Sequence, residues 1–127
     1  MADSSVPEWV QFAKMDYNTA KHLYQTMYPK PLEIICYHCQ QAAEKLLKAI
    51  IINYGGTIEK THDLGLLAER CAEFVGVSDE IYDLCDNLTP YGVKIRYPDE
   101  LFLEEHHVVS ALADTEELLK WFEGLNM

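Results

Sequence analysis

An uninterrupted helix-forming stretch at residues 34–52 is the feature that most constrains the fold. It contains neither Gly nor Pro and is rich in Ala, Leu, Lys, Glu and Gln, which have high helix propensity. Its apolar residues recur at spacings of three and four, so they form one wide stripe along a helix. We therefore expect the central helix of a bundle, with its stripe covered by other helices. The stripe consists of Ile35, Cys39, Ala42, Ala43, Leu46, Leu47 and Ile50.

Proline and glycine residues divide the rest of the chain into further helical segments, because neither residue is favoured inside a helix. No segment shows the strict alternation that indicates a strand. We predict an all-α fold, an antiparallel up-and-down bundle of four to five helices, in a single domain over residues 1–127. The stretch 89–100 contains Pro90, Gly92 and Pro98 and is expected to be irregular. The expected helices lie at about residues 7–28, 31–54, 64–76, 78–88 and 100–123.

The chain is strongly acidic, with a formal net charge of −11 at pH 7. This charge argues against a protein that grips nucleic acid over a broad surface, because phosphate contacts need lysine and arginine. It is compatible with a small basic pocket or with a basic partner protein. No apolar run approaches the roughly 18 residues of a membrane helix, and the N-terminal residues lack the features of a signal peptide. We therefore expect no membrane association and a cytoplasmic location.

The cysteines raise the question of a metal site. Cys36 and Cys39 have the spacing of half a zinc site, but such a site needs two further ligands at a fixed spacing. Cys71 and Cys85 are isolated in the sequence and do not supply that second pair. All four fall within apolar helical patterns, where a free cysteine behaves as a small buried apolar residue. We interpret them as packing residues.

His106 and His107 are adjacent at the start of the last predicted helix, beside Glu104 and Glu105. Consecutive helical residues point about 100° apart, which disfavours a metal site shared by the two rings. We interpret the pair as solvated. The sequence predicts neither a metal nor a cofactor.

Asp16 interrupts the apolar series of the first helix. It either binds a ligand or forms a hydrogen bond to a neighbouring helix, and we favour the second interpretation.

Two short polar segments contain the residues that could hold an anion. Lys60 and His62 precede the third helix, where free backbone N–H groups attract negative charge. The interpretation that we favour is that His62 packs under the loop while Asp63 caps the helix. In the irregular stretch, Arg96 could contact a phosphate and Tyr97 could stack on a base. The alternative there is a structural ion pair between Arg96 and one of the many carboxylates.

Three segments together resemble the HEPN domain family, whose members are small helical domains. The first helix, with Asp16 and Tyr17 among its matching residues, is also similar to the family pattern, so the resemblance covers nearly the whole chain. It implies an antiparallel bundle of four or five helices that pairs as a homodimer. The three segments are residues 35–49, residues 60–64 with Leu67, and residues 96–98.

The resemblance implies two biochemical roles. Many members are RNases with an Arg followed, after four to six residues, by a His, and two copies form one composite site. Other members resemble binding partners of small nucleotidyltransferases, often in toxin–antitoxin pairs of prokaryotes. Arg70 has no His after it before His106, and residues 97–105 separate Arg96 from His106, so this chain departs from the nuclease pattern.

We therefore predict a non-catalytic module that binds a nucleotide or presents substrate to a partner nucleotidyltransferase. One alternative is a divergent, metal-independent RNase that uses Arg96 with His106 or His107. A second alternative is a structural dimerisation domain. The expected partners are a second copy, a nucleotidyltransferase, and a nucleotide or RNA. The predicted ligand-binding residues are Lys60, His62, Lys94, Arg96 and Tyr97.

Overall fold

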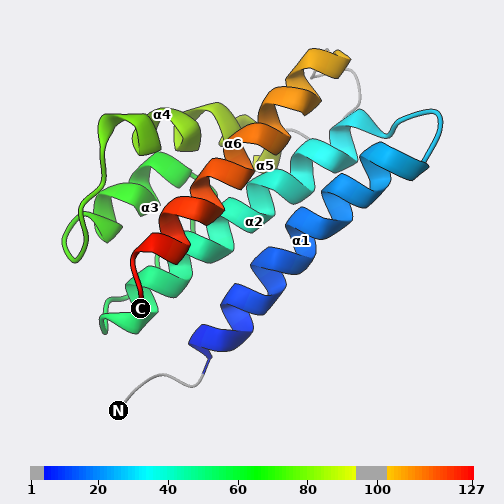
Figure 1. Ribbon diagram of the computed structural model, residues 1–127. Helices are drawn as coiled ribbons and strands as arrows, with labels where there is room; N and C mark the ends of the chain where they lie inside the picture. The colour runs from blue at the N-terminus through cyan, green and yellow to red at the C-terminus, as the bar shows by residue number, and fades with distance from the viewer. Residues whose placement is uncertain (1–4, 94–102) are drawn as a thin grey trace.

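The computed structural model describes residues 5–93 and 103–127 of the chain. Three long helices and three shorter ones, joined by turns and loops, lie within these residues (Figure 1). No strand occurs among these residues, and the predicted all-α class is confirmed. The helices are α1 (Val6–Thr26), α2 (Leu32–Asn53), α3 (Leu64–Cys71), α4 (Asp79–Leu88), α5 (Pro90–Val93) and α6 (Glu105–Gly124).

Helix α2 lies at the centre of the bundle and contacts each of the other helices. Figure 1 shows α1 running antiparallel to α2, and α6 running antiparallel to α1. The shorter helices α3 and α4 lie on the other side of α2 from α1 (Figure 1). This arrangement confirms the central position predicted for residues 34–52.

The apolar stripe of α2 forms the middle of the core. Ala42 and Ala43 are fully buried, and their small side chains let neighbouring helices approach closely. Cys39, Leu46 and Ile50 of the same stripe are also fully buried. The stripe therefore faces the other helices along most of the length of α2.

Helix α3 ends earlier than the sequence predicted. The prediction extended it to Gly76, but the helix stops at Cys71 and turns follow. Phe74 leaves the helical path and stacks on Tyr54, with ring centroids 5.4 Å apart and an interplanar angle of 5°. A contact between rings this far apart in the sequence leaves no trace in local periodicity.

The stretch expected to be irregular contains one short helix. Thr89 keeps helical backbone angles after α4, and α5 begins at Pro90, a residue that suits the first turn of a helix. The last helix starts at Glu105 rather than near residue 100. The backbone N–H of Glu104 donates to Nδ1 of His107 over 3.0 Å, which fixes this start.

Candidate functional site

One flank of α2 is polar and carries two clusters of interacting side chains. The Glu44 cluster consists of Gln40, Glu44 and Lys48 of α2 with His62 from the segment before α3. The Asp16 cluster consists of Asp16 of α1 with His38 and Lys45 of α2. Each cluster contains one carboxylate, one lysine and one histidine. The polar flank of α2 thus lies between α1 and the segment that precedes α3.

Glu44 is a buried carboxylate, with a side chain only 8% exposed. It accepts hydrogen bonds from Nζ of Lys48 over 2.9 Å and from Nε2 of Gln40 over 3.1 Å. Its Oε1 atom also lies 2.9 Å from Nδ1 of His62. Burial raises the pKa of Glu44, but the hydrogen bonds from Lys48, His62 and Gln40 outweigh this effect and hold the pKa below its ordinary value. Glu44 is therefore charged at neutral pH.

His62 is held in place from two directions. Its ring faces Glu44, and its backbone carbonyl accepts a hydrogen bond from Nε2 of Gln40 over 3.2 Å. A carboxylate can only accept, so Nδ1 of His62 carries the hydrogen of this contact. The His62 side chain is 54% exposed, and Nε2 is the ring nitrogen left for a ligand. The predicted packing of His62 under the loop is therefore wrong.

Gln40 connects the Glu44 cluster to α5. The Gln40 residue is fully buried, and a Cβ at Gly92 would lie only 2.5 Å from its Cδ atom. Gly92 thus allows the α5 backbone to press against the Gln40 amide. Two residues after Gly92 comes Lys94, the first of three predicted ligand residues that lie outside the described part of the chain. These three are Lys94, Arg96 and Tyr97.

The backbone at the start of α3 differs from the predicted anion site. The N–H of Leu66 donates to Oδ1 of Asp63 over 3.3 Å, and the N–H of Leu64 donates to Oγ1 of Thr89 over 3.1 Å. These groups already have partners inside the protein, so an anion held by them is not supported. The predicted capping by Asp63 is confirmed.

Lys60 remains a candidate ligand residue. It is exposed, and within residues 5–93 and 103–127 no carboxylate, aromatic ring or hydrogen-bond acceptor contacts its ammonium group. An unpaired cation in a chain of net charge −11 is available to an anion. Lys60 also lies two residues before His62 in the sequence.

The Asp16 cluster joins α1 to α2. Oδ1 of Asp16 lies 2.8 Å from Nδ1 of His38, and Oδ2 accepts a hydrogen bond from Nζ of Lys45. The predicted hydrogen bond of Asp16 to a neighbouring helix is confirmed. Both oxygens are used between the helices, so this cluster supports packing rather than ligand binding.

The four cysteines are packing residues, as predicted. Each is free and buried, and burial raises the pKa of each thiol to about 12. A thiol with this pKa is protonated at neutral pH and is a poor nucleophile. Among the described residues, no group of His, Cys, Asp and Glu side chains could hold a metal ion.

His106 and His107 lie closer together than predicted. Their ring centroids are 4.0 Å apart, with an interplanar angle of 33°. The pair lies in the first turn of α6, where Nδ1 of His107 accepts from the backbone N–H of Glu104. His107 therefore stabilises the helix start, while the ring of His106 is exposed.

The sequence interpretation did not include Gln40, Glu44 and Lys48 in a site. Their spacing of four residues places them in one row along the polar flank of α2. A Gln and a Glu in a row beside the apolar stripe were the available indication of a buried polar cluster. The partner of Glu44, His62, could not be identified in this way because 18 residues separate the two in the sequence.

None of the described helices is long and apolar enough to cross a membrane.

Comparisons with known proteins place the chain among small helical domains. The HEPN domain family matches residues 6–125. The crystal structure of TT1696 from Thermus thermophilus is similar, with a TM-score of 0.80 and 22% sequence identity over 96% of this chain and 98% of the other. The structure of ST0689, an archaeal HEPN homologue, matches with a TM-score of 0.72 and 21% identity over 94% and 96% of the two chains. The search of curated proteins gave no match.

Proposed function

Because the chain belongs to the HEPN domain family, we propose that it is a non-catalytic module that binds a nucleotide and presents it, or a substrate, to a partner nucleotidyltransferase. One observation carries this proposal: the buried Glu44 carboxylate holds the exposed His62 ring over 2.9 Å. A ring held in this way is preorganised to contact a ligand through Nε2.

The phosphate groups of the nucleotide are proposed to lie beside His62 and Lys60. A phosphate oxygen accepts hydrogen bonds from the Lys60 ammonium and from Nε2 of His62 when that nitrogen carries a hydrogen. Lys94 and Arg96 would add positive charge, and Tyr97 would stack on the base. In the sequence these three residues follow Gly92, whose backbone lies against Gln40 of the Glu44 cluster.

Binding is favoured over catalysis by the chemistry of the described side chains. The cysteine thiols have a pKa of about 12 and are not activated as nucleophiles. Glu44 is charged and already accepts hydrogen bonds from Gln40 and Lys48, so it serves to orient His62. The partner nucleotidyltransferase and the toxin–antitoxin pairing rest on the family resemblance.

Titration calorimetry with ATP, GTP, CTP and UTP tests the site. We expect His62→Ala to weaken nucleotide binding by about tenfold or more, because a hydrogen bond to a charged group contributes about 1.5–3 kcal/mol. The charge reversal Arg96→Glu should weaken it further. His22→Ala, which removes an exposed histidine from α1, is the matched control and should bind as the wild type does. Equal affinity of the wild type, His62→Ala and Arg96→Glu for every nucleotide would refute the proposed site.

The second candidate function is an RNase that uses Arg96 with His106 or His107. The exposed ring of His106, 4.0 Å from that of His107, favours it because an exposed imidazole can act as a general acid or base. Purified protein is incubated with RNA in parallel with Arg96→Ala and the His106/His107 double alanine variant. Cleavage by the wild type that both variants lose would establish the RNase, and cleavage that persists in both would exclude these residues.

A further inference from the structure

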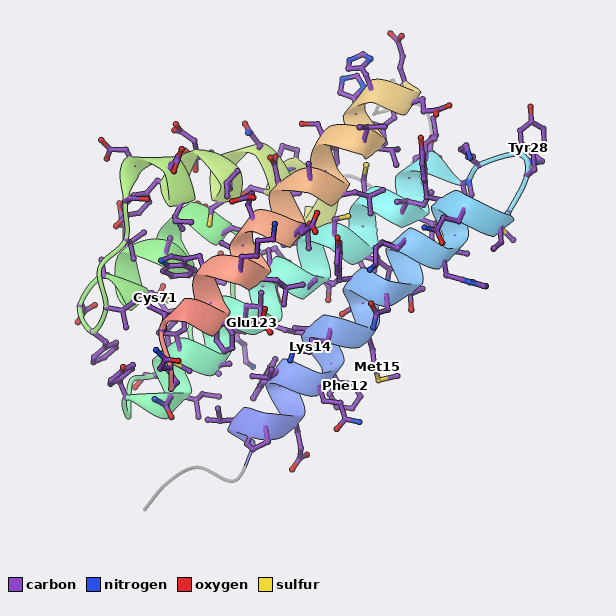
Figure 2. The ribbon with its side chains drawn as sticks, viewed as in Figure 1. Phe12, Lys14, Met15, Tyr28, Cys71 and Glu123 are labelled. Carbon is purple, nitrogen blue, oxygen red and sulfur yellow. The ribbon has the colours of Figure 1, made fainter. Side chains whose placement is uncertain are left out.

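The first half of α1 presents two exposed apolar side chains, Phe12 and Met15, which we call the α1 ridge. Phe12 is 54% exposed and Met15 is 53% exposed. The two residues are three apart, so their side chains are neighbours on the helix surface. Figure 2 shows both pointing away from the bundle, whereas the buried residues of α1 are Ala13, Tyr17 and Ala20. The α1 ridge thus contributes little to the core, and neighbouring exposed apolar side chains are typical of an interaction surface.

A hollow lies on each side of the α1 ridge. The larger one, between α1 and α6, has a volume of about 740 Å³, and Met15 forms part of its wall. The smaller one, between α1 and α2, has a volume of about 230 Å³, and Phe12 lines it together with Trp9 and Lys45. A raised apolar ridge with a hollow on either side can pack against a second copy of the same surface, because each ridge meets a hollow of the other copy.

The formal charges of this surface cancel. Helix α1 contains two acidic and two basic residues. The charged side chains that α2 and α6 add to the hollows are Lys45 and Glu123, which also cancel. By contrast, α4 contains four acidic residues and no basic one. In a chain of net charge −11, the α1 surface is therefore one on which two copies can meet without net repulsion. The four charged residues of α1 are Glu8, Lys14, Asp16 and Lys21.

Two-fold symmetry determines how two copies would meet on this surface. In a symmetric pair of identical surfaces each contact occurs twice, once in each direction. With the two α1 helices antiparallel and the axis beside the α1 ridge, Phe12 of each copy faces Met15 of the other. A methionine sulfur and an aromatic ring make a favourable contact. Each α1 helix then lies over the larger hollow of the other copy, so α1 and α6 of both copies pack together as in a four-helix bundle.

We propose that the α1 ridge and the two hollows beside it form the contact between two copies of this chain. The α1 helix of the second copy, rather than a segment of a different protein, occupies the larger hollow. Three observations support this occupant: the exposed apolar ridge, the hollows that a ridge can enter, and the charges that sum to zero. The contact gives a location to the homodimer that the family resemblance implies. It does not depend on the Glu44 cluster, so a failure of the nucleotide site leaves it standing.

Sedimentation velocity over a range of concentrations tests the contact. We expect the wild type to form a dimer, and the dimer dissociation constant to be at least tenfold higher for Met15→Asp and for Phe12→Asp. Each substitution places two carboxylates without partners in the apolar contact. Val109→Asp is the matched control, because Val109 is 49% exposed on α6 and lines neither hollow, and it should dimerise as the wild type does. Circular dichroism of each variant confirms that the helical fold is kept.

Chemical cross-linking tests the position of the contact independently. Met15→Cys places an exposed thiol close to the second copy, so a short bismaleimide should join the two chains, whereas Val109→Cys should give no covalent dimer. The four natural cysteines are buried, with a thiol pKa of about 12, and do not compete for the reagent.

Three results would overturn the proposal. The first is a wild type that stays monomeric at every concentration. The second is dimerisation of Met15→Asp and Phe12→Asp that is as strong as that of the wild type. The third is cross-linking of Val109→Cys without cross-linking of Met15→Cys, because the second copy would then lie on another face.

Discussion

At the scale of single residues, Glu44 shows how a buried charge is accommodated. Its 8% exposed side chain would be costly to bury alone, because a charge loses its hydration inside a protein. Lys48, Gln40 and His62 replace the lost water as hydrogen-bond partners. Of these contacts, those with Gln40 and Lys48 join residues four apart and were visible in the sequence. The contact with His62 depends on the chain returning to α2 after its turn at Gly55 and Gly56.

The Glu44 cluster predicts a pH dependence of stability. The folded pKa of Glu44 is lowered, so its stabilisation is complete above the ordinary glutamate pKa of about 4.3 and is lost as the pH falls through the lowered folded value. Glu44→Gln should reduce the free energy of unfolding at neutral pH by about 1.5–3 kcal/mol, because hydrogen bonds to a charged group are lost. Urea unfolding at a series of pH values measures both effects.

The comparison with Glu69→Gln is the control, because Glu69 is an exposed glutamate of α3. Its effect should be within about 0.5 kcal/mol at every pH. If the difference between the wild type and Glu44→Gln stayed constant from neutral pH to acid, Glu44 would not be the titrating group.

At the scale of elements, periodicity and helix-breaking residues predicted the long helices well. Helix α2 was expected at about residues 31–54 and spans Leu32–Asn53, because Pro31 and Gly55 mark its ends. The end of α3 and the short α5 were missed, because the stacking of Phe74 on Tyr54 and the contact of Gly92 with Gln40 join distant parts of the chain. The candidate site was harder to predict for the same reason. The role of His62 in ligand binding stays a prediction, and its contact with the Glu44 carboxylate was not foreseen because 18 residues separate the two.

The contact between α5 and α2 gives a prediction at this scale. Gly92→Ala places a methyl group 2.5 Å from Cδ of Gln40, so either α5 or the Gln40 side chain must move. We expect a loss of about 1–3 kcal/mol in the free energy of unfolding, as for overpacked cores. Chemical denaturation of the single variants Gly92→Ala and Gln40→Ala and of the double variant measures the coupling between the two residues.

The double variant has room for the new methyl group, so its loss should be smaller than the sum of the two single losses. Gly76→Ala is the control, because a Cβ at Gly76 meets no atom within 4 Å. Strictly additive losses would show that Gly92 and Gln40 do not press on each other.

At the scale of the whole molecule, the negative net charge and the candidate nucleotide site are expected to act on a nucleotide in opposite ways. The chain carries a net charge of −11, yet the candidate nucleotide site includes Lys60, which has no carboxylate partner within residues 5–93 and 103–127, and His62, which Glu44 orients. In the proposed function, the acidic surroundings repel a nucleotide from most of the surface, and the Lys60 ammonium offers a local attraction. Composition predicted the repulsion and the sequence placed Lys60 close to His62, while the contact of His62 with Glu44 required the fold.

The homodimer implied by the family resemblance is a prediction at this scale. Light scattering coupled to size-exclusion chromatography should give twice the chain mass of 14.6 kDa. A mass of 14.6 kDa at every concentration tested would contradict the predicted homodimer.

The four buried cysteines can be used to measure transient opening of the helical bundle. A thiol with a pKa of about 12 and no access to solvent does not react with an alkylating reagent in the closed state. Labelling therefore occurs only when the helix that carries the cysteine separates from its neighbours. Cys71 and Cys85 lie on the short helices α3 and α4, whereas Cys36 and Cys39 lie on α2. Peptide mapping by mass spectrometry should find the first pair labelled earlier, and equal rates for all four would indicate that the bundle opens only as a whole.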